Sequence, residues 1–265
     1  MQDTLNLYGK TFAERFLLGT AGYPSMQTLK EAIAVANPAM ITVAVRRQSA
    51  NQQEAGQGFW NLLQNINIPL LPNTAGCQTV KEAVATAQMA REIFNTNWIK
   101  LEIIADNDTL QPDPFQLPVA AELLIKDGFN VLPYCTEDLT VCRKLIDVGC
   151  QVLMPWAAPI GSALGVVHEY ALRSLRERLP EIPLIIDAGL GLPSHAAQVM
   201  EYGFDGVLLN SAVAHSNNPI QVAQAFALAT KAGRLAFLGT PPAPINTAKA
   251  STPTIGMPFW HSKEL

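Results

Sequence analysis

Short apolar runs recur along this chain at a nearly constant spacing, and this repeat restricts the possible folds more than any other feature. Eight such runs begin between residues 16 and 206, about 27 residues apart on average. Runs of this length, bounded by turn residues, predict β-strands. They lie at Phe16–Gly19, Met40–Val45, Pro69–Pro72, Trp98–Ile104, Asn130–Tyr134, Gln151–Pro155, Leu184–Ala188 and Gly206–Leu209.

Amphipathic segments with helix start and stop signals lie between most of these runs. Ser25 precedes a helix predicted over Met26–Val35, and Thr79 with Glu82 forms a capping box before a helix that reaches about Phe94. Further helices are predicted over Asp138–Val148, from Pro193 to Tyr202, and from Pro219 to about Ala232, where Gly233 is the stop signal. Strands that alternate with helices indicate a parallel sheet. Eight such units in 265 residues favour an α/β fold of the closed (β/α)₈ TIM-barrel type over an open sheet.

The chain changes character after residue 239. Residues 1–239 contain the predicted barrel, which we interpret as the catalytic domain, and residues 240–265 hold five of the 19 prolines. This composition predicts an irregular or flexible tail. Docking of Phe259-Trp260-His261 on a surface is the alternative to a disordered tail.

Composition excludes several classes of protein. Charged residues make up only 15% of the chain, against about 25% in typical domains, which indicates a large core or buried subunit surface. The net charge is −4, so no nucleic-acid partner is expected. No apolar run approaches the ~18 residues that would span a membrane, and the N-terminus lacks a secretory signal, so we predict a cytoplasmic location. Neither the four cysteines nor the four histidines have metal-ligand spacing, so no metal site, disulfide or cofactor is predicted.

A lysine lies in the middle of the fourth apolar run. Alternation along a strand places Trp98, Lys100 and Glu102 on one face and apolar residues on the other. In an ordinary half-buried strand, that polar face would be solvated. In a closed barrel the same face points toward the barrel axis, and burial would favour a neutral, nucleophilic amine at Lys100.

Further polar groups follow the last three strands, where the carboxyl ends of barrel strands form active sites and often bind phosphate. Asp187 ends the seventh strand before Gly189, and Asn210 with Ser211 follows the eighth strand. Gly161 lies in a small-residue turn after the sixth strand. We interpret Asp187 as a catalytic group rather than a helix-capping or turn residue, and the three loops as phosphate ligands.

Other residues near strand ends receive weaker interpretations. One of Arg46 and Arg47 is expected to reach the barrel mouth and bind a carboxylate or phosphate. Cys77 and Cys135 are interpreted as small packing residues, because neither has a histidine nearby in sequence that would activate it.

A buried lysine with two carboxylates and a phosphate site suggests imine chemistry on a phosphorylated ketose. The amine would attack the carbonyl, and Glu102 and Asp187 would move protons. Burial would lower the pKa of Lys100 and the carboxylates would raise it, and the sequence leaves the outcome open.

From about Phe16 to Leu238, the chain resembles the bacterial thiazole synthases, which build the thiazole phosphate half of thiamine. The resemblance rests on several long matches, which together are far more specific than a single motif. They are Ile41–Arg47, Leu71–Cys77, Trp98–Glu102, Leu132–Thr136, Ala158–Ser162 and Asp187–Gly189.

The resemblance implies a (β/α)₈ barrel whose lysine, matching Lys100, forms a Schiff base with 1-deoxy-D-xylulose 5-phosphate. Sulfur would come from the thiocarboxylated C-terminus of a ubiquitin-like sulfur carrier protein, and dehydroglycine would complete the ring. Glu102 and Asp187 match the acid–base groups. The residues that match those holding the sugar phosphate are Gly161, Ala188, Gly189, Asn210 and Ser211. A homotetramer is also implied.

The chain departs from this pattern at three places. Ser211 stands where the family usually has Thr, Ala21-Gly22-Tyr23 where it has Gly-Lys-Tyr, and Trp156-Ala157 where it has Leu-Gly. Two competing functions stay open from the residues: a Schiff-base aldolase on a related sugar phosphate, and a catalytically silent barrel that binds phosphate or the carrier.

Overall fold

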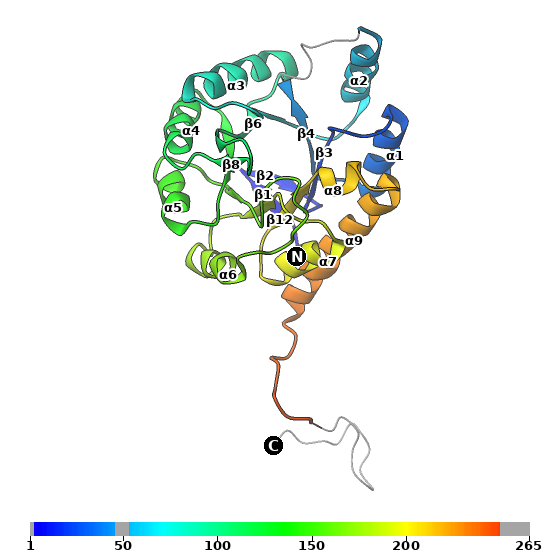
Figure 1. Cartoon of the computed structure of the whole chain (residues 1–265), viewed down its shortest axis with the longest axis vertical. Coiled ribbons are helices and arrows are strands. Elements are labelled where there is room, and N and C mark those ends of the chain that lie inside the picture. The colour runs from blue at the N-terminus through cyan, green and yellow to red at the C-terminus, as the bar shows by residue number, and fades with distance from the viewer. Residues whose placement is uncertain (1–2, 46–52, 250–265) are drawn as a thin grey trace.

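The computed structural model describes residues 3–45 and 53–249 and contains a (β/α)₈ barrel, which confirms the predicted fold class (Figure 1). Eight parallel strands pair in the order β10-β9-β6-β5-β4-β3-β12-β11. A bridge between Leu153 and Leu184 joins the two outer strands and closes the ring. The strands are β3 (Phe16–Gly19), β4 (Met40–Ala44), β5 (Leu70–Asn73), β6 (Trp98–Leu101), β9 (Asn130–Cys135), β10 (Met154–Pro155), β11 (Ile185–Asp187) and β12 (Gly206–Leu209).

Helices surround this ring, and the predicted start signals act as helix caps. The side chains of Ser25, Thr79 and Asp138 accept hydrogen bonds from backbone N–H groups in the first turns of α1, α3 and α5. The helices are α1 (Met26–Ala36), α2 (Gln53–Asn65), α3 (Val80–Phe94), α4 (Gln116–Lys126), α5 (Leu139–Asp147), α6 (Glu169–Arg178), α7 (Pro193–Glu201), α8 (Ser211–Ala214) and α9 (Pro219–Gly239).

The last helix is longer than the sequence predicts. Gly233 was expected to stop it, but α9 continues to Gly239. A Cβ atom at position 233 would lie 2.4 Å from the carbonyl oxygen of Ala197 and 2.8 Å from Cβ of Met200, both in α7. The glycine therefore allows α7 and α9 to approach closely, and the prediction of a helix end there was wrong.

The fourth barrel strand is shorter than predicted. Its parallel pairing ends at Leu101, and Ile104 instead belongs to a small antiparallel hairpin of β7 (Ile104–Asp106) and β8 (Gln111–Pro112). This hairpin lies at the carboxyl end of the barrel because it continues directly from β6. A second hairpin, of β1 (Leu5–Leu7) and β2 (Lys10–Phe12), precedes the first barrel strand.

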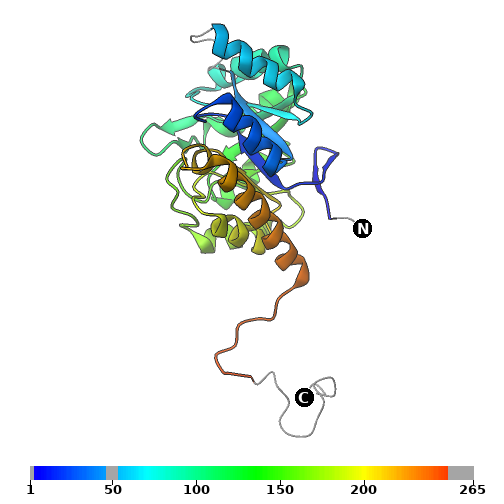
Figure 2. The same ribbon diagram turned by 90° about the vertical axis from the view of Figure 1, so that its right-hand side faces the viewer.

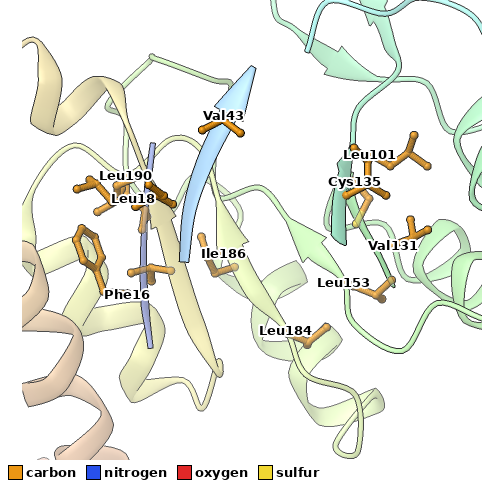
Figure 3. Close-up of a cluster of buried hydrophobic side chains, with 14 of the residues drawn as sticks. Phe16, Leu18, Val43, Leu101, Val131, Cys135, Leu153, Leu184, Ile186 and Leu190 are labelled. Atoms are coloured by element: carbon orange, nitrogen blue, oxygen red, sulfur yellow. The ribbon is translucent and has the colours of Figure 1, made fainter. Parts of the chain in front are cut away.

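The apolar core has two layers. The outer layer lies between strands and helices and contains the side chains drawn in Figure 3, such as Leu18, Leu101 and Val131. The inner layer fills the barrel and includes Leu17, Met40, Leu71 and Ile185 together with Leu5, Leu7 and Phe12 of the N-terminal hairpin. The hairpin thus closes the amino-terminal end of the barrel, which leaves the carboxyl end available for a cavity.

Residues 240–249 extend from α9 away from the barrel, as Figure 2 shows, and they are exposed without helix or strand. The predicted tail is described only over these residues, and Phe259-Trp260-His261 lies outside the described ranges, as do Arg46 and Arg47. Within residues 3–45 and 53–249, no helix has the length and apolar character that a membrane crossing requires.

Candidate active site

The barrel directs Lys100 into its interior. Trp98, two residues earlier in β6, packs edge-on against Tyr8 and Phe12 of the N-terminal hairpin, with ring centroids 5.7 and 6.1 Å apart. Side chains two apart in a strand share a face, so Lys100 faces the same interior, nearer the carboxyl end. Lys100 is only 5% exposed, which excludes the solvated-face alternative.

The ammonium group of Lys100 lies between two carboxylates. Its Nζ atom is 2.6 Å from Oδ2 of Asp187 and 3.2 Å from Oε1 of Glu102. Both carboxylates are buried, and Asp187 comes from the end of β11, across the barrel from β6. The structure therefore brings these three predicted residues to one point.

Glu102 follows the last residue of β6 and is held by its backbone. The hydroxyl of Thr74 accepts a hydrogen bond from the N–H of Glu102 and donates one to its carbonyl, both at 2.7 Å. This clamp keeps the strand alternation for one more residue although the parallel pairing has ended. It explains how Glu102 shares the interior face with Lys100.

The charge state of this cluster follows from two opposing effects. Burial lowers the pKa of Lys100, but the carboxylates of Asp187 and Glu102 outweigh it and hold that pKa above its usual range. Burial raises the pKa of Asp187 to about 6, against the opposing effect of Lys100. The resting cluster therefore contains a protonated lysine next to a carboxylate that accepts a proton more readily than an exposed one.

A cavity of about 600 Å³ opens above the cluster, at the carboxyl ends of the strands. All eight residues predicted from the sequence line it, and they come from β6 and β11 and from the segments that follow β6, β10, β11 and β12. They are Lys100, Glu102, Gly161, Asp187, Ala188, Gly189, Asn210 and Ser211.

The loops predicted to bind phosphate meet on one side of this cavity. A Cβ atom on Gly161 would lie 3.8 Å from Oγ of Ser211, so the loop after β10 approaches the segment after β12. The N–H of Gly165 donates to the carbonyl of Gly189 at 2.8 Å, which joins the loops after β10 and β11. These contacts place the small residues of three loops around a common space.

Ala188 and Gly189 both have positive φ angles, of 83°. At Gly189 a Cβ atom would lie 2.4 Å from the backbone nitrogen of Ala158, so no other residue fits. At Ala188 the same backbone region is unfavourable for an L-residue, and such local strain is concentrated at functional sites. The turn after β11 therefore requires glycine at position 189 and holds Ala188 in an unfavourable backbone region.

Three residues near Lys100 or in the cavity lining were not predicted from the sequence. The ring of Tyr134 lies 5.6 Å from Nζ of Lys100, and Asn73 and His215 line the cavity. Alternation in β9 places Tyr134 on the face opposite to Cys135, so the strand pattern was the available signal for the tyrosine. For His215 no signal existed, because it follows the last strand by six residues and reaches the cavity through the turn of α8.

The remaining candidates have packing roles. Cys77 and Cys135 are fully buried in the outer core layer, as expected for packing residues. Trp156 packs edge-on against Tyr134 and donates a hydrogen bond from Nε1 to Glu137. No cluster of three metal-ligating side chains occurs among the described residues.

The fold and the site define a (β/α)₈-barrel enzyme with its polar groups at the carboxyl ends of the strands. Residues 6–253 match the family described as thiazole biosynthesis protein ThiG, and the chain belongs to this family. A thiazole synthase of Neisseria meningitidis serogroup C is 67% identical over 260 residues, which cover 98% of this chain and 99% of the relative. A thiazole synthase of Ralstonia pickettii is 63% identical over 262 residues, with coverage of 99% and 95%. Family and relatives support a thiazole synthase function.

Solved structures share the fold. The Amycolatopsis orientalis BexX/CysO complex contains a chain that superposes with a TM-score of 0.80 at 24% identity, over 92% of this chain and 98% of that one. A native KDPGal structure superposes with a TM-score of 0.57 at 16% identity, over 83% and 96%. At these identities the likeness concerns the barrel fold alone.

Proposed function

We propose that this protein is a transferase that forms the thiazole phosphate moiety of thiamine through a Schiff base on Lys100. The substrates are 1-deoxy-D-xylulose 5-phosphate, dehydroglycine and sulfur from a thiocarboxylated, ubiquitin-like sulfur carrier protein. The observation that carries this proposal is the position of Lys100 Nζ, 2.6 Å from Asp187 and 3.2 Å from Glu102 on the floor of the cavity.

The first step is a proton transfer. Lys100 gives one proton from Nζ to Oδ2 of Asp187, whose raised pKa suits it to receive that proton. The free amine adds to the ketone carbon of the sugar, and a proton moves from the attached nitrogen to the former carbonyl oxygen, which becomes a hydroxyl group. Protonation of this hydroxyl by Asp187 releases water and leaves an iminium on Lys100.

The iminium then acidifies the neighbouring carbon. Glu102 is the second carboxylate near Nζ, at 3.2 Å, and we assign to it the removal of a proton from that carbon while Asp187 serves the imine nitrogen. The rearranged intermediate receives sulfur from the carrier, dehydroglycine condenses with it, and loss of water closes the ring. Both carboxylates are buried, which keeps these proton transfers away from bulk water.

The sugar phosphate is held by Gly161, Ala188, Gly189, Asn210 and Ser211, which line one side of the cavity. The positive φ angles of Ala188 and Gly189 turn consecutive backbone groups, and such turned backbones form concave anion sites. The hydroxyl of Ser211 replaces the threonine of similar chains and supplies the same donor.

Two protein partners belong to the proposal. The cavity opens at the carboxyl end of the barrel, where a carrier C-terminus would enter, and BexX of the same fold was solved in a complex with CysO. A homotetramer of this chain is also proposed. Its support is an exposed apolar patch on α3 and α4, made of Met89, Ile93, Phe115, Val119 and Leu123.

The test is reconstitution of the reaction. The enzyme is incubated with 1-deoxy-D-xylulose 5-phosphate, dehydroglycine and the thiocarboxylated carrier, and thiazole phosphate is detected by mass spectrometry. We expect product only with all three components and none with Lys100→Ala. Conversion of the sugar phosphate without the carrier would favour the aldolase alternative, and absence of any conversion would contradict the proposal.

A further inference from the structure

A histidine at the rim of the cavity has no role in the reaction described so far. The lining residues that the structure describes include two basic side chains, Lys100 and His215. Lys100 forms ion pairs with two carboxylates, those of Asp187 and Glu102. The exposed ring of His215 has no hydrogen bond or ion pair with any residue in the described ranges.

The backbone places His215 next to the loops proposed to hold phosphate. Its N–H donates to the carbonyl of Ser211 at 3.0 Å, one turn earlier, so the two side chains project from the same side of α8. Gly161 lies next to Ser211 in the cavity lining, because a Cβ atom there would lie 3.8 Å from the serine Oγ. His215 therefore stands at the outer edge of the same group of residues.

The loop after the first strand leaves room for this ring. Gly22 has a φ angle of 81°, and a Cβ atom on it would lie 2.8 Å from Nε2 of His215. A side chain at position 22 would displace the imidazole from the rim. The glycine thus supports the position of a residue 193 positions further along the chain.

The described lining of the cavity carries more negative than positive charge, so binding of an anion there would benefit from a further hydrogen-bond donor. Among the described lining residues, Glu102 and Asp187 oppose the single positive charge of Lys100. A phosphate ester brings further negative charge into this space. The imidazole of His215 offers an N–H donor, and hydrogen bonds to ionised groups are the stronger kind.

We propose that His215 is a substrate-binding residue that donates a hydrogen bond from its imidazole to the phosphate group of the ketose substrate. The inference rests on the proposed function and adds to it a specificity determinant for phosphorylated over unphosphorylated sugar. In this proposal His215 binds the phosphate group, and Lys100 reacts with the carbonyl group at the other end of the sugar.

The test measures how trapping of the imine by borohydride depends on substrate concentration. Two ketoses are compared, 1-deoxy-D-xylulose 5-phosphate and 1-deoxy-D-xylulose. His215→Ala is expected to raise the half-saturating concentration of the phosphorylated sugar about tenfold, the effect of about 1.4 kcal/mol, and to leave that of the unphosphorylated sugar unchanged. His215→Lys is expected to restore most of the loss, because it supplies a cation at the same place.

His168→Ala is the matched control, since His168 is an exposed histidine outside the cavity lining. An equal loss for both sugars, no loss in His215→Ala, or an equal loss in His215→Ala and His215→Lys would overturn the proposal. If the wild-type protein traps no imine, the proposed function fails. Calorimetric titration with inorganic phosphate then tests His215 by itself, with weaker binding expected in His215→Ala and unchanged binding contradicting the inference.

Discussion

At the scale of single residues, the charge of Lys100 is the property that most affects the chemistry. The lysine is buried, which alone would favour the neutral amine, but two carboxylates within 3.2 Å keep it protonated at rest. The positive charge of the protonated lysine compensates the two buried carboxylates, which would otherwise be costly to bury. Its release as a nucleophile then depends on the acceptor at 2.6 Å, Asp187.

Asp187→Asn should change both the rate and the pH dependence of imine trapping. In the wild type, trapping is expected to rise with pH as Lys100 loses its proton. The asparagine removes a carboxylate that raises the pKa of Lys100, so half-maximal trapping should move to lower pH. The maximal rate should fall about 100-fold because the proton acceptor is missing.

The measurement is the pH profile of the trapped adduct by mass spectrometry from about pH 6 to about pH 12, a range that reaches the raised pKa of Lys100. Asp147→Asn, at an exposed position in α5, is the control and should behave as the wild type. A profile of Asp187→Asn that keeps the wild-type midpoint would mean that Asp187 does not set the charge of Lys100.

At the scale of elements, the close approach of α7 and α9 depends on Gly233. Gly233→Ala should lower the free energy of unfolding by about 1–3 kcal/mol, because its methyl group would contact Ala197 O at 2.4 Å. Urea denaturation measures this loss. Gly58→Ala, at an exposed position in α2 with no atom near the added methyl group, should instead gain up to about 1 kcal/mol. Equal stability of Gly233→Ala and the wild type would contradict the packing role.

Gly233 also shows where prediction from the sequence ends. A glycine that stops a helix and a glycine that admits a neighbouring helix look the same in one sequence. The capped starts at Ser25, Thr79 and Asp138 were predictable because the signal and the hydrogen bond lie within four residues. The early end of β6 depends on the pairing of Ile104 with Pro112, which strand periodicity does not reveal.

The site was predictable to a similar degree. Lys100 and Glu102 share a strand face, and Asp187 ends a strand of the same barrel, so the alternation and the fold class together place them. The direction of the pKa shift of Lys100 depends on its distances to the two carboxylates, and only the folded barrel sets these distances. Tyr134 and His215 join the site through tertiary packing, and for His215 this occurs outside any periodic element.

At the scale of the whole molecule, the low charged fraction of 15% and the exposed apolar residues on α3 and α4 are what the proposed tetramer would require. Phe115, directly before α4, and Val119 and Leu123 within it follow one another at intervals of four, and they are 83%, 50% and 47% exposed. Ile93 and Met89 continue the patch on the neighbouring helix α3.

The double variant Phe115→Glu with Val119→Glu should therefore dissociate the proposed tetramer, because charge at a buried contact opposes association. Sedimentation velocity of the wild type and the variant measures this effect. Tyr170→Glu, an equally exposed aromatic position on α6, is the control and should keep the wild-type mass. A variant that sediments as the wild type, or a monomeric wild type, would contradict the assignment of this patch.

The central claim is that Lys100 forms the covalent link to the sugar, and peptide mapping after borohydride reduction tests it most directly. The protein is reduced in the presence of 1-deoxy-D-xylulose 5-phosphate, digested and analysed by tandem mass spectrometry. We predict one modified peptide with the sugar on Lys100, and no adduct in folded Lys100→Ala. An adduct on a different lysine, or none in the wild type, would contradict the account.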